Sequence, residues 1–189
     1  ATDKVWHELS FGLESLGYDT PTIRRRVAEM ASFFGIQTWF YKSVTELSGG
    51  QKQLLNLASV MVLQPKVLIL DEPASQLDPI AASDFLATLG KINRELGTTI
   101  ILTEHRLEEA FGFASRVAVM DGGRLLCTGT PAEVGAELKS SGNAMFLAMP
   151  AAMRIWAASD SKATCPISVC DGRNWLLDYA KTHELRPVP

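Results

Sequence analysis

Two acidic residues stand side by side directly after a short apolar run near the middle of the chain. The apolar residues 67–70 lead into Asp71 and Glu72, and Pro73 follows. Because α/β proteins bind ligands at the carboxyl ends of their strands, this pattern favours a site there. Asp71 would orient a hydrated Mg²⁺ ion, and Glu72 would accept a proton from a water that attacks a phosphate. The alternative is a strand that ends in two exposed acids.

A second candidate is a glycine-rich stretch that leads into a helix. The stretch Leu47–Gln51 contains Ser48, Gly49 and Gly50, and a helical pattern covers residues 52–63. The glycines leave backbone N–H groups open to a ligand, Ser48 adds a hydroxyl, and the helix dipole favours negative charge at its start. This combination predicts a surface for binding a polyphosphate. A flexible turn is the alternative, because Ser-Gly-Gly alone is a weak signal.

Two more short motifs lie beyond the carboxylates. Residues Ser75–Asp78 form a turn, in which Asp78 is suited to cap the helix that follows. Thr103, Glu104 and His105 come directly after a second apolar run, where His105 could donate to a γ-phosphate oxygen and hold the attacking water. A structural histidine at a strand end is the alternative for His105. The four motifs are more specific together than singly, because each also fits its expected strand, loop or helix.

Strands and helices alternate around these motifs. Such alternation predicts an α/β fold with a parallel sheet, and the apolar strands at 66–70 and 98–103 are expected to be buried. Gly122 and Gly123 between two short strands indicate a hairpin. After residue 140 the pattern weakens. The expected helices are 5–16, 20–34, 79–96, 107–113 and 130–138, and the expected hairpin strands are 116–120 and 124–127.

Composition narrows the class of protein. The chain has 189 residues, of which 47% are hydrophobic and 21% charged, as in a globular domain with its own core. No apolar run approaches the ~20 residues needed to cross a bilayer, and the N-terminus has no signal-peptide pattern. A membrane association is therefore expected to depend on a protein partner.

Charge and cysteines add two further expectations. The net charge is -3 and the basic residues are scattered, so no nucleic-acid partner is predicted and Arg24–Arg26 is interpreted as a solvated helix face. The three cysteines fit reduced cytosolic thiols better than a disulfide framework. A metal-binding pair made of Cys165 and Cys170 is the alternative.

The motifs together resemble the ATP-binding cassette (ABC) ATPases. Leu47–Gln51 is similar to the signature motif of that family, 67–72 to its Walker B strand with the catalytic glutamate, and Ser75–Asp78 to its D-loop, although Gln76 stands where alanine or glycine is commoner. His105 is similar to the switch histidine. The resemblance covers residues 1 to about 140. It implies an α/β fold of the P-loop NTPase (RecA-like) type, with a parallel sheet and a helical subdomain.

The resemblance also implies a domain plan and a mechanism. Residues 1–47 would form the helical subdomain, 48–140 the C-terminal half of the ATPase core, and 141–189 an extension that could join a second ATPase domain. In this family two ATPase domains enclose two ATP molecules with Mg²⁺. Asp71, Glu72 and His105 would act on one nucleotide. Ser48, Gly49, Gly50, Gln51 and Asp78 would bind at the shared interface, the signature residues reaching the nucleotide of the partner domain.

Finer details are similar to the energy-coupling factor branch, whose members drive uptake of vitamins and of cobalt or nickel ions. The relevant segments are 2–9 and 72–79, and the tail segment 149–176 is similar to the linker of fused two-domain versions. This implies a transmembrane transporter subunit as partner and a peripheral location on the cytoplasmic face of the cell membrane. The alternative is a soluble ABC ATPase that acts on ribosomes or DNA, although no long coiled coil or charged arm is visible.

Some aromatic residues of the first segment are candidates for contact with such a membrane subunit. They are Phe11, Trp39 and Phe40. Burial in the core is the alternative for each of them.

The phosphate-binding loop of the family does not occur in this sequence. No Gly-x-x-x-x-Gly-Lys-Ser/Thr is present, so the Walker A strand, the N-terminal β-subdomain and the Q-loop glutamine are expected upstream of Ala1 in the native gene product. We expect the chain alone to be inactive as an ATPase. A natural degenerate protein is the alternative, but both carboxylates and His105 remain.

Overall fold

A computed structural model describes residues 3–183 of the chain. Thr2 of the segment 2–9 and the closing residues 184–189 lie outside the described part. The chain forms two compact units, residues 1–104 and residues 105–189. This boundary differs from the domain divisions expected after residues 47 and 140, and those divisions stay a prediction. Within residues 3–183 no helix is long and apolar enough to span a bilayer.

The first half of the first unit is helical. Its helices pack through apolar residues spaced four apart, such as Val5, Leu9 and Leu13 of α1, which are fully buried. Leu16 was expected in the same stripe, but it is exposed because it follows the last residue of α1 and Gly17 turns the chain with a φ of 75°. The elements are α1 (Val5–Ser15), α2 (Thr20–Phe33), η1 (Ile36–Trp39), η2 (Val44–Glu46) and α3 (Gly49–Met61).

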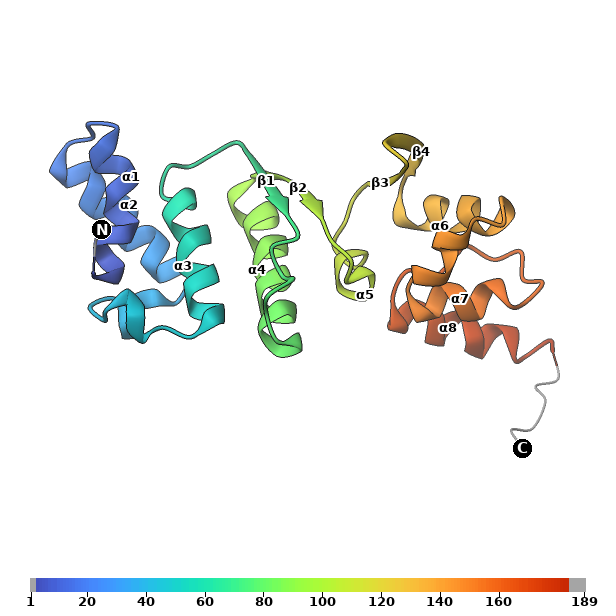
Figure 1. Ribbon diagram of the computed structural model, residues 1–189. Coiled ribbons are helices and arrows are strands. Elements are labelled where there is room, and N and C mark those ends of the chain that lie inside the picture. Colours follow the sequence, from blue (N-terminus) through green and yellow to red (C-terminus); the bar gives the residue numbers. More distant parts are fainter. Residues whose placement is uncertain (1–2, 184–189) are drawn as a thin grey trace. The chain divides into compact units, whose positions relative to one another are not determined.

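The second half of the first unit is a strand–helix–strand unit (Figure 1). Strands β1 (Val67–Asp71) and β2 (Thr99–Thr103) pair in parallel, and helix α4 (Pro79–Leu96) connects them. Helix α4 packs against β2 and buries Phe85, Leu89 and Ile92, as its apolar spacing predicts. The predicted parallel pairing is confirmed.

The expected burial of both strands is wrong. Leu68 is buried, but Val67, Ile69 and Ile101 are exposed by 51%, 73% and 54%. In the described part of the chain, this sheet has two strands. The alternation of buried and exposed residues follows from the period of two along a strand, because one face of the pair is covered and the other is open.

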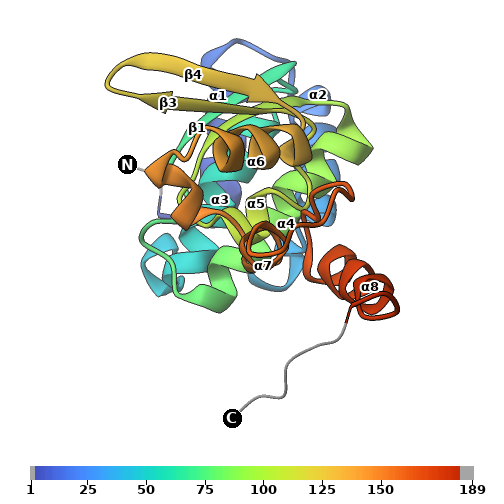
Figure 2. The ribbon, with the colours of Figure 1, turned by 90° about the vertical axis from the view of Figure 1, so that its right-hand side faces the viewer.

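The second unit contains the predicted hairpin and the C-terminal helices (Figure 2). Strands β3 (Val117–Asp121) and β4 (Arg124–Gly129) are antiparallel, and Gly122 and Gly123 between them both have positive φ. Helix α6 packs against β4. The helices are α5 (Leu107–Ala110), α6 (Pro131–Ser140), η3 (Ala144–Ala148), α7 (Ala151–Ala157) and α8 (Val169–Tyr179).

The second unit has a core of its own. It is built from the hairpin, α6 and α7, and Trp156 and Met153 are among its members. Helix α5 ends at Ala110 and is therefore shorter than the expected helix 107–113. The weak sequence pattern after residue 140 is explained by short helices, of which α8 has no buried residue.

The candidate contact residues of the helical segment separate in the structure. Phe11 is exposed by 59%, whereas Trp39 is buried and Phe40 is half-buried. For Trp39 the alternative, burial in the core, therefore applies.

Candidate functional site

The two carboxylates are located at the carboxyl end of β1. Asp71 is the last residue of the strand, and it lies opposite Thr103, the last residue of β2. The Thr103 hydroxyl donates a hydrogen bond to Asp71 Oδ1 at 2.5 Å. Both residues are exposed, so this bond orients a carboxylate that remains accessible to a ligand.

Glu72 has an unusual backbone conformation. Its φ is 42°, in the left-handed region that residues other than glycine rarely adopt. Such a conformation costs on the order of 1–3 kcal/mol and persists where its surroundings enforce it. The N–H of Glu72 donates to Thr103 O at 3.2 Å and to Thr103 Oγ1 at 3.0 Å. The end of β2 therefore fixes the turn that Glu72 makes.

The glycine-rich motif is already part of helix α3. The helix was expected from Lys52, but it begins at Gly49, and Ser48 is its N-cap. Ser48 Oγ accepts from Gln51 N at 3.2 Å, and Ser48 N donates to Gln51 Oε1 at 3.0 Å, which makes a capping box. This arrangement satisfies the backbone N–H groups of Ser48 and Gln51 and leaves those of Gly49 and Gly50.

The N–H groups of Gly49 and Gly50 are available to a ligand. Within the described residues, no acceptor lies within hydrogen-bonding distance of either one. A helix start with free N–H groups and a positive dipole end is suited to a phosphate oxygen. The geometry therefore fits the polyphosphate surface expected from the sequence.

Asp78 caps the helix between the two strands. Its Oδ1 accepts hydrogen bonds from Ile80 N at 3.1 Å and from Ala81 N at 3.0 Å. The capping that the sequence predicts is confirmed. A β-carbon at Gly50 would lie 3.3 Å from Ala81 Cβ, so the first turns of α3 and α4 lie side by side.

A contact that the sequence did not indicate links α3 to residues 71–73, which we call the carboxylate turn. Gln53 Nε2 donates to Pro73 O at 2.9 Å, and this bond is partly buried. Gln53 is on the second turn of α3, and Pro73 follows Glu72. The glycine-rich helix start and the carboxylates are thus connected by one side chain.

Comparison with known proteins identifies the family. The profile of the ABC transporter family matches residues 3–75. A Bacillus cereus protein named as an ABC transporter ATP-binding protein is 49% identical over 180 residues, which are 94% of this chain and 32% of that protein. The chain belongs to the ABC transporter ATP-binding family. It spans about a quarter to a third of the length of three curated Bacillus relatives that it matches.

Solved ABC ATP-binding domains have the same fold. CbiO1 from Clostridium perfringens, described as part of the ABC transporter complex CbiONQ, has a TM-score of 0.68 and 35% identity, with 82% of this chain and 62% of that one covered. The ADP form of MJ1267, an ATP-binding cassette of an ABC transporter, has a TM-score of 0.63 and 21% identity, over 77% of this chain and 62% of that one. The predicted fold class, an α/β ABC ATPase of the P-loop NTPase type, is confirmed.

Within this ABC domain, most of the expected site residues fall in one unit. Ser48, Gly49, Gly50 and Gln51 at the start of α3 lie in the first unit with Asp71, Glu72 and Asp78. His105 is the first residue of the second unit and is exposed. The contacts described above connect the members of the first unit only.

The residues present are compatible with Mg²⁺ bound together with a nucleotide. Asp71 offers an oriented, exposed carboxylate, and in residues 3–183 no group of three or more His, Cys, Asp and Glu side chains is arranged to hold a metal ion. Mg²⁺ characteristically takes one or two carboxylates and fills its shell with waters and phosphate oxygens. The alternative of a cysteine pair is not supported, because Cys165 is buried and Cys170 is exposed.

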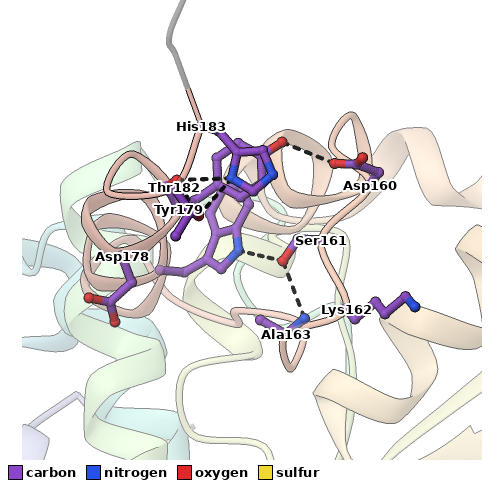
Figure 3. Close-up of a pocket in the computed structure, with 9 residues that line it drawn as sticks. Asp160, Ser161, Lys162, Ala163, Asp178, Tyr179, Thr182 and His183 are labelled. Atoms are coloured by element: carbon purple, nitrogen blue, oxygen red, sulfur yellow. Dashed lines mark hydrogen bonds between the residues drawn. The ribbon is translucent and has the colours of Figure 1, made fainter.

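The second unit contains a hollow of about 350 Å³, which is another candidate site (Figure 3). The hydroxyl of Tyr179 donates to Asp160 Oδ1 at 3.0 Å, which lowers the pKa of Asp160. Trp175 Nε1 donates to Ser161 Oγ at 3.1 Å, and the ring of His183 stacks on that of Tyr179 at 3.9 Å. These groups bond one another, so the cluster anchors α8, and we assign it no ligand.

Sequence reasoning assigned no role to two residues of the site, although it included one of them, Thr103, in a motif. Gln53 and Thr103 hold the carboxylate turn from two sides, yet neither has a chemical function that its type would reveal. For Thr103 a signal did exist, since two parallel strands that end together place their last residues opposite one another. Gln53 had no comparable signal, because its partner is a backbone carbonyl.

Proposed function

We propose that the protein to which this chain belongs hydrolyses ATP and couples the hydrolysis to transport across a membrane. The observation that carries the proposal is the pair Asp71 and Glu72 at the carboxyl end of β1, held there by Thr103. Membership of the ABC transporter ATP-binding family supports it. A soluble ABC ATPase of ribosomes or DNA is less consistent with the names of the relatives.

The two carboxylates would have different roles at one nucleotide. Asp71 would orient Mg²⁺ through a coordinated water, and the bound ion would neutralise charge on the phosphates. Glu72 would accept a proton from the water that attacks the γ-phosphate. His105 would donate to an oxygen of the same phosphate and hold the attacking water in line.

The start of α3 would act on a second nucleotide, bound by another ATPase domain. The free N–H groups of Gly49 and Gly50 support this assignment, since they would bind terminal phosphate oxygens together with the Ser48 hydroxyl. Gln51 and Asp78 would contribute indirectly, because each holds the start of a helix at this surface.

Substitution of the proposed base tests the function. In the full-length protein, Glu72→Gln should lower ATP turnover by about 10²–10⁴-fold, because the general base is lost, while ATP binding is retained. Glu95→Gln on the exposed side of α4 is the matched control and should leave turnover unchanged. An inactive full-length protein, or normal turnover with Glu72→Gln, would contradict the proposal.

We further propose an importer of the energy-coupling factor branch, peripheral to the cytoplasmic face of the membrane and bound to a transmembrane subunit. Its cargo would be a vitamin or a cobalt or nickel ion. The likeness to CbiO1 at 35% identity supports the branch. Phe11, exposed on α1, is the candidate contact. Phe11→Ser should reduce co-purification of a membrane protein. Leu147→Ser, at an even more exposed apolar residue of the second unit, should not.

The second ATPase domain could belong to the same chain. The aligned part is 32% of the Bacillus cereus relative, so that protein has room for two such domains. Residues 141–189 would then lead from one domain toward the next, after the helical segment 1–47 and the core segment 48–140. Light scattering of the full-length protein with ATP and Glu72→Gln would distinguish an internal pair of domains from a dimer of chains.

A further inference from the structure

We propose that Thr103 is the positioning residue for both carboxylates of the ATPase site. Its hydroxyl would orient Asp71 for a metal ion, and its backbone and side-chain oxygens together hold Glu72 in the left-handed conformation. The inference rests on the proposed ATP hydrolysis and adds to it a third residue, which acts by positioning Asp71 and Glu72.

The contact with Asp71 fixes one oxygen of the carboxylate. Asp71 and Thr103 occupy matched positions in the parallel register, so their side chains emerge on the same open face of the strand pair. The hydroxyl donates to Oδ1 at 2.5 Å. With Oδ1 occupied in this way, the rotation of the carboxylate is restricted, and Oδ2 is the oxygen that would serve a hydrated metal ion. Such outer partners of metal-binding groups characteristically control affinity and activity.

The contact with Glu72 fixes the backbone beyond the strand. Glu72 N donates to both oxygens of Thr103, at 3.2 Å and 3.0 Å, while its φ of 42° is unfavourable for a residue with a side chain. Loss of the hydroxyl would remove one of these bonds and allow the turn to relax. The proposed general base would then lose the alignment that its chemistry requires.

A threonine is well suited to both tasks because a hydroxyl donates one hydrogen bond and accepts others. Here it donates to Asp71 and accepts from Glu72. Thr103 is exposed, so its methyl group adds little to the core. Valine has nearly the same shape without the hydroxyl, and serine keeps the hydroxyl without the methyl group. These two substitutions separate the proposed function from packing.

The test compares Thr103→Val and Thr103→Ser in the full-length protein. We expect Thr103→Val to lower kcat by about 10- to 100-fold and to raise the Mg²⁺ concentration required for half-maximal rate by a similar factor. The KM for ATP should change little, because the phosphates are held by other groups. Thr103→Ser should recover most of the lost rate. Melting temperatures report whether both variants fold.

A second measurement examines the Asp71 contact without turnover. With Glu72→Gln to stop hydrolysis, Mn²⁺ binding in the presence of ATP is followed by electron paramagnetic resonance. Adding Thr103→Val should weaken Mn²⁺ binding about tenfold or more, and adding Thr103→Ser should not. Thr103→Ala in both experiments replaces the valine variant if that variant does not fold.

The outcomes separate the two proposals. An active full-length protein in which Thr103→Val retains normal kcat and Mg²⁺ dependence overturns the assignment of Thr103 and leaves the ATPase function standing. A serine variant as impaired as the valine variant also overturns it, since the hydroxyl would then not be responsible. A protein without ATP turnover and without response to Glu72→Gln contradicts both.

Discussion

Gly50 lies against Ala81, whereas its neighbour Gly49 faces open space. A β-carbon at Gly50 would come within 3.3 Å of Ala81 Cβ, while one at Gly49 would have no atom within 4 Å. Neither glycine has a positive φ, so backbone conformation does not explain them. The two glycines of one motif are therefore required for different reasons: Gly50 lets α3 approach α4, and Gly49 leaves the helix start open.

The close approach predicts a stability effect at Gly50. Gly50→Ala should be less favourable for stability than Gly49→Ala, because the added methyl group would lie 3.3 Å from Ala81 Cβ and would require α3 or α4 to shift. Ala81→Gly removes the methyl group that it meets. The double variant should therefore be more stable than the sum of the two single effects, as thermal unfolding can measure. Strict additivity would show that the two positions do not interact.

Gly49→Ala should lower activity without lowering stability. The added methyl group meets no protein atom, and alanine is favoured over glycine in a helix by roughly 0.5–1 kcal/mol, so the melting temperature should be unchanged or higher. ATP turnover should nevertheless fall, because the methyl group covers the surface on which the phosphate of a second nucleotide would lie. Normal turnover in this variant would argue against phosphate contact at Gly49.

Gln53→Met tests the link between α3 and the carboxylate turn. Methionine keeps the length of the side chain and removes the donor to Pro73 O. We expect a loss of about 0.5–1.5 kcal/mol in stability and a lower kcat, because the turn after Glu72 loses its second anchor. Lys52→Met is the control on the exposed neighbouring position. Equal turnover in the two variants would show that the bond is not needed for catalysis.

Asp78 allows capping to be distinguished from charge. Asp78→Ala should destabilise α4 by about 0.5–2 kcal/mol, because the N–H groups of Ile80 and Ala81 lose their acceptor. Asp78→Asn keeps an acceptor oxygen and should keep the melting temperature. A fall in ATP turnover with asparagine but not in stability would assign the carboxylate charge to the interface between ATPase domains. Loss of stability in both variants would show that the negative charge of Asp78 is needed to cap α4.

The sequence predicted the elements of this chain more securely than their surroundings. The parallel pairing of β1 and β2 follows from two apolar runs joined by an amphipathic helix. Their burial does not follow, because a run such as 67–70 looks the same whether one face or both faces are covered. Ile69, exposed by 73%, illustrates the difference.

In the site, too, some residues could be recognised from the sequence and others only from the structure. Asp71, Glu72 and Ser48 could be recognised because their chemistry is written in their residue types and order. Thr103 and Gln53 act through hydrogen bonds to a neighbouring strand and turn, and such contacts exist only after folding. Gly50 was interpreted as having an N–H open to a ligand, which the structure retains. Its packing against Ala81 was not predicted, because that packing depends on how two helices meet, which local sequence does not encode.

Burial of Cys165 gives a final prediction about pH. Removal from solvent raises the pKa of its thiol from the ordinary 9.0 to about 11, so the thiolate, which is the reactive form, is scarce at neutral pH. Its alkylation by iodoacetamide should be slow at pH 7 to 8 and should rise until the pH reaches about 11. Exposed Cys170 should react first. Mass spectrometry of the two peptides measures both rates, and Cys170→Ala should leave the Cys165 profile unchanged. Rapid alkylation of Cys165 in the folded protein at pH 7 would contradict its burial against α6 and α7.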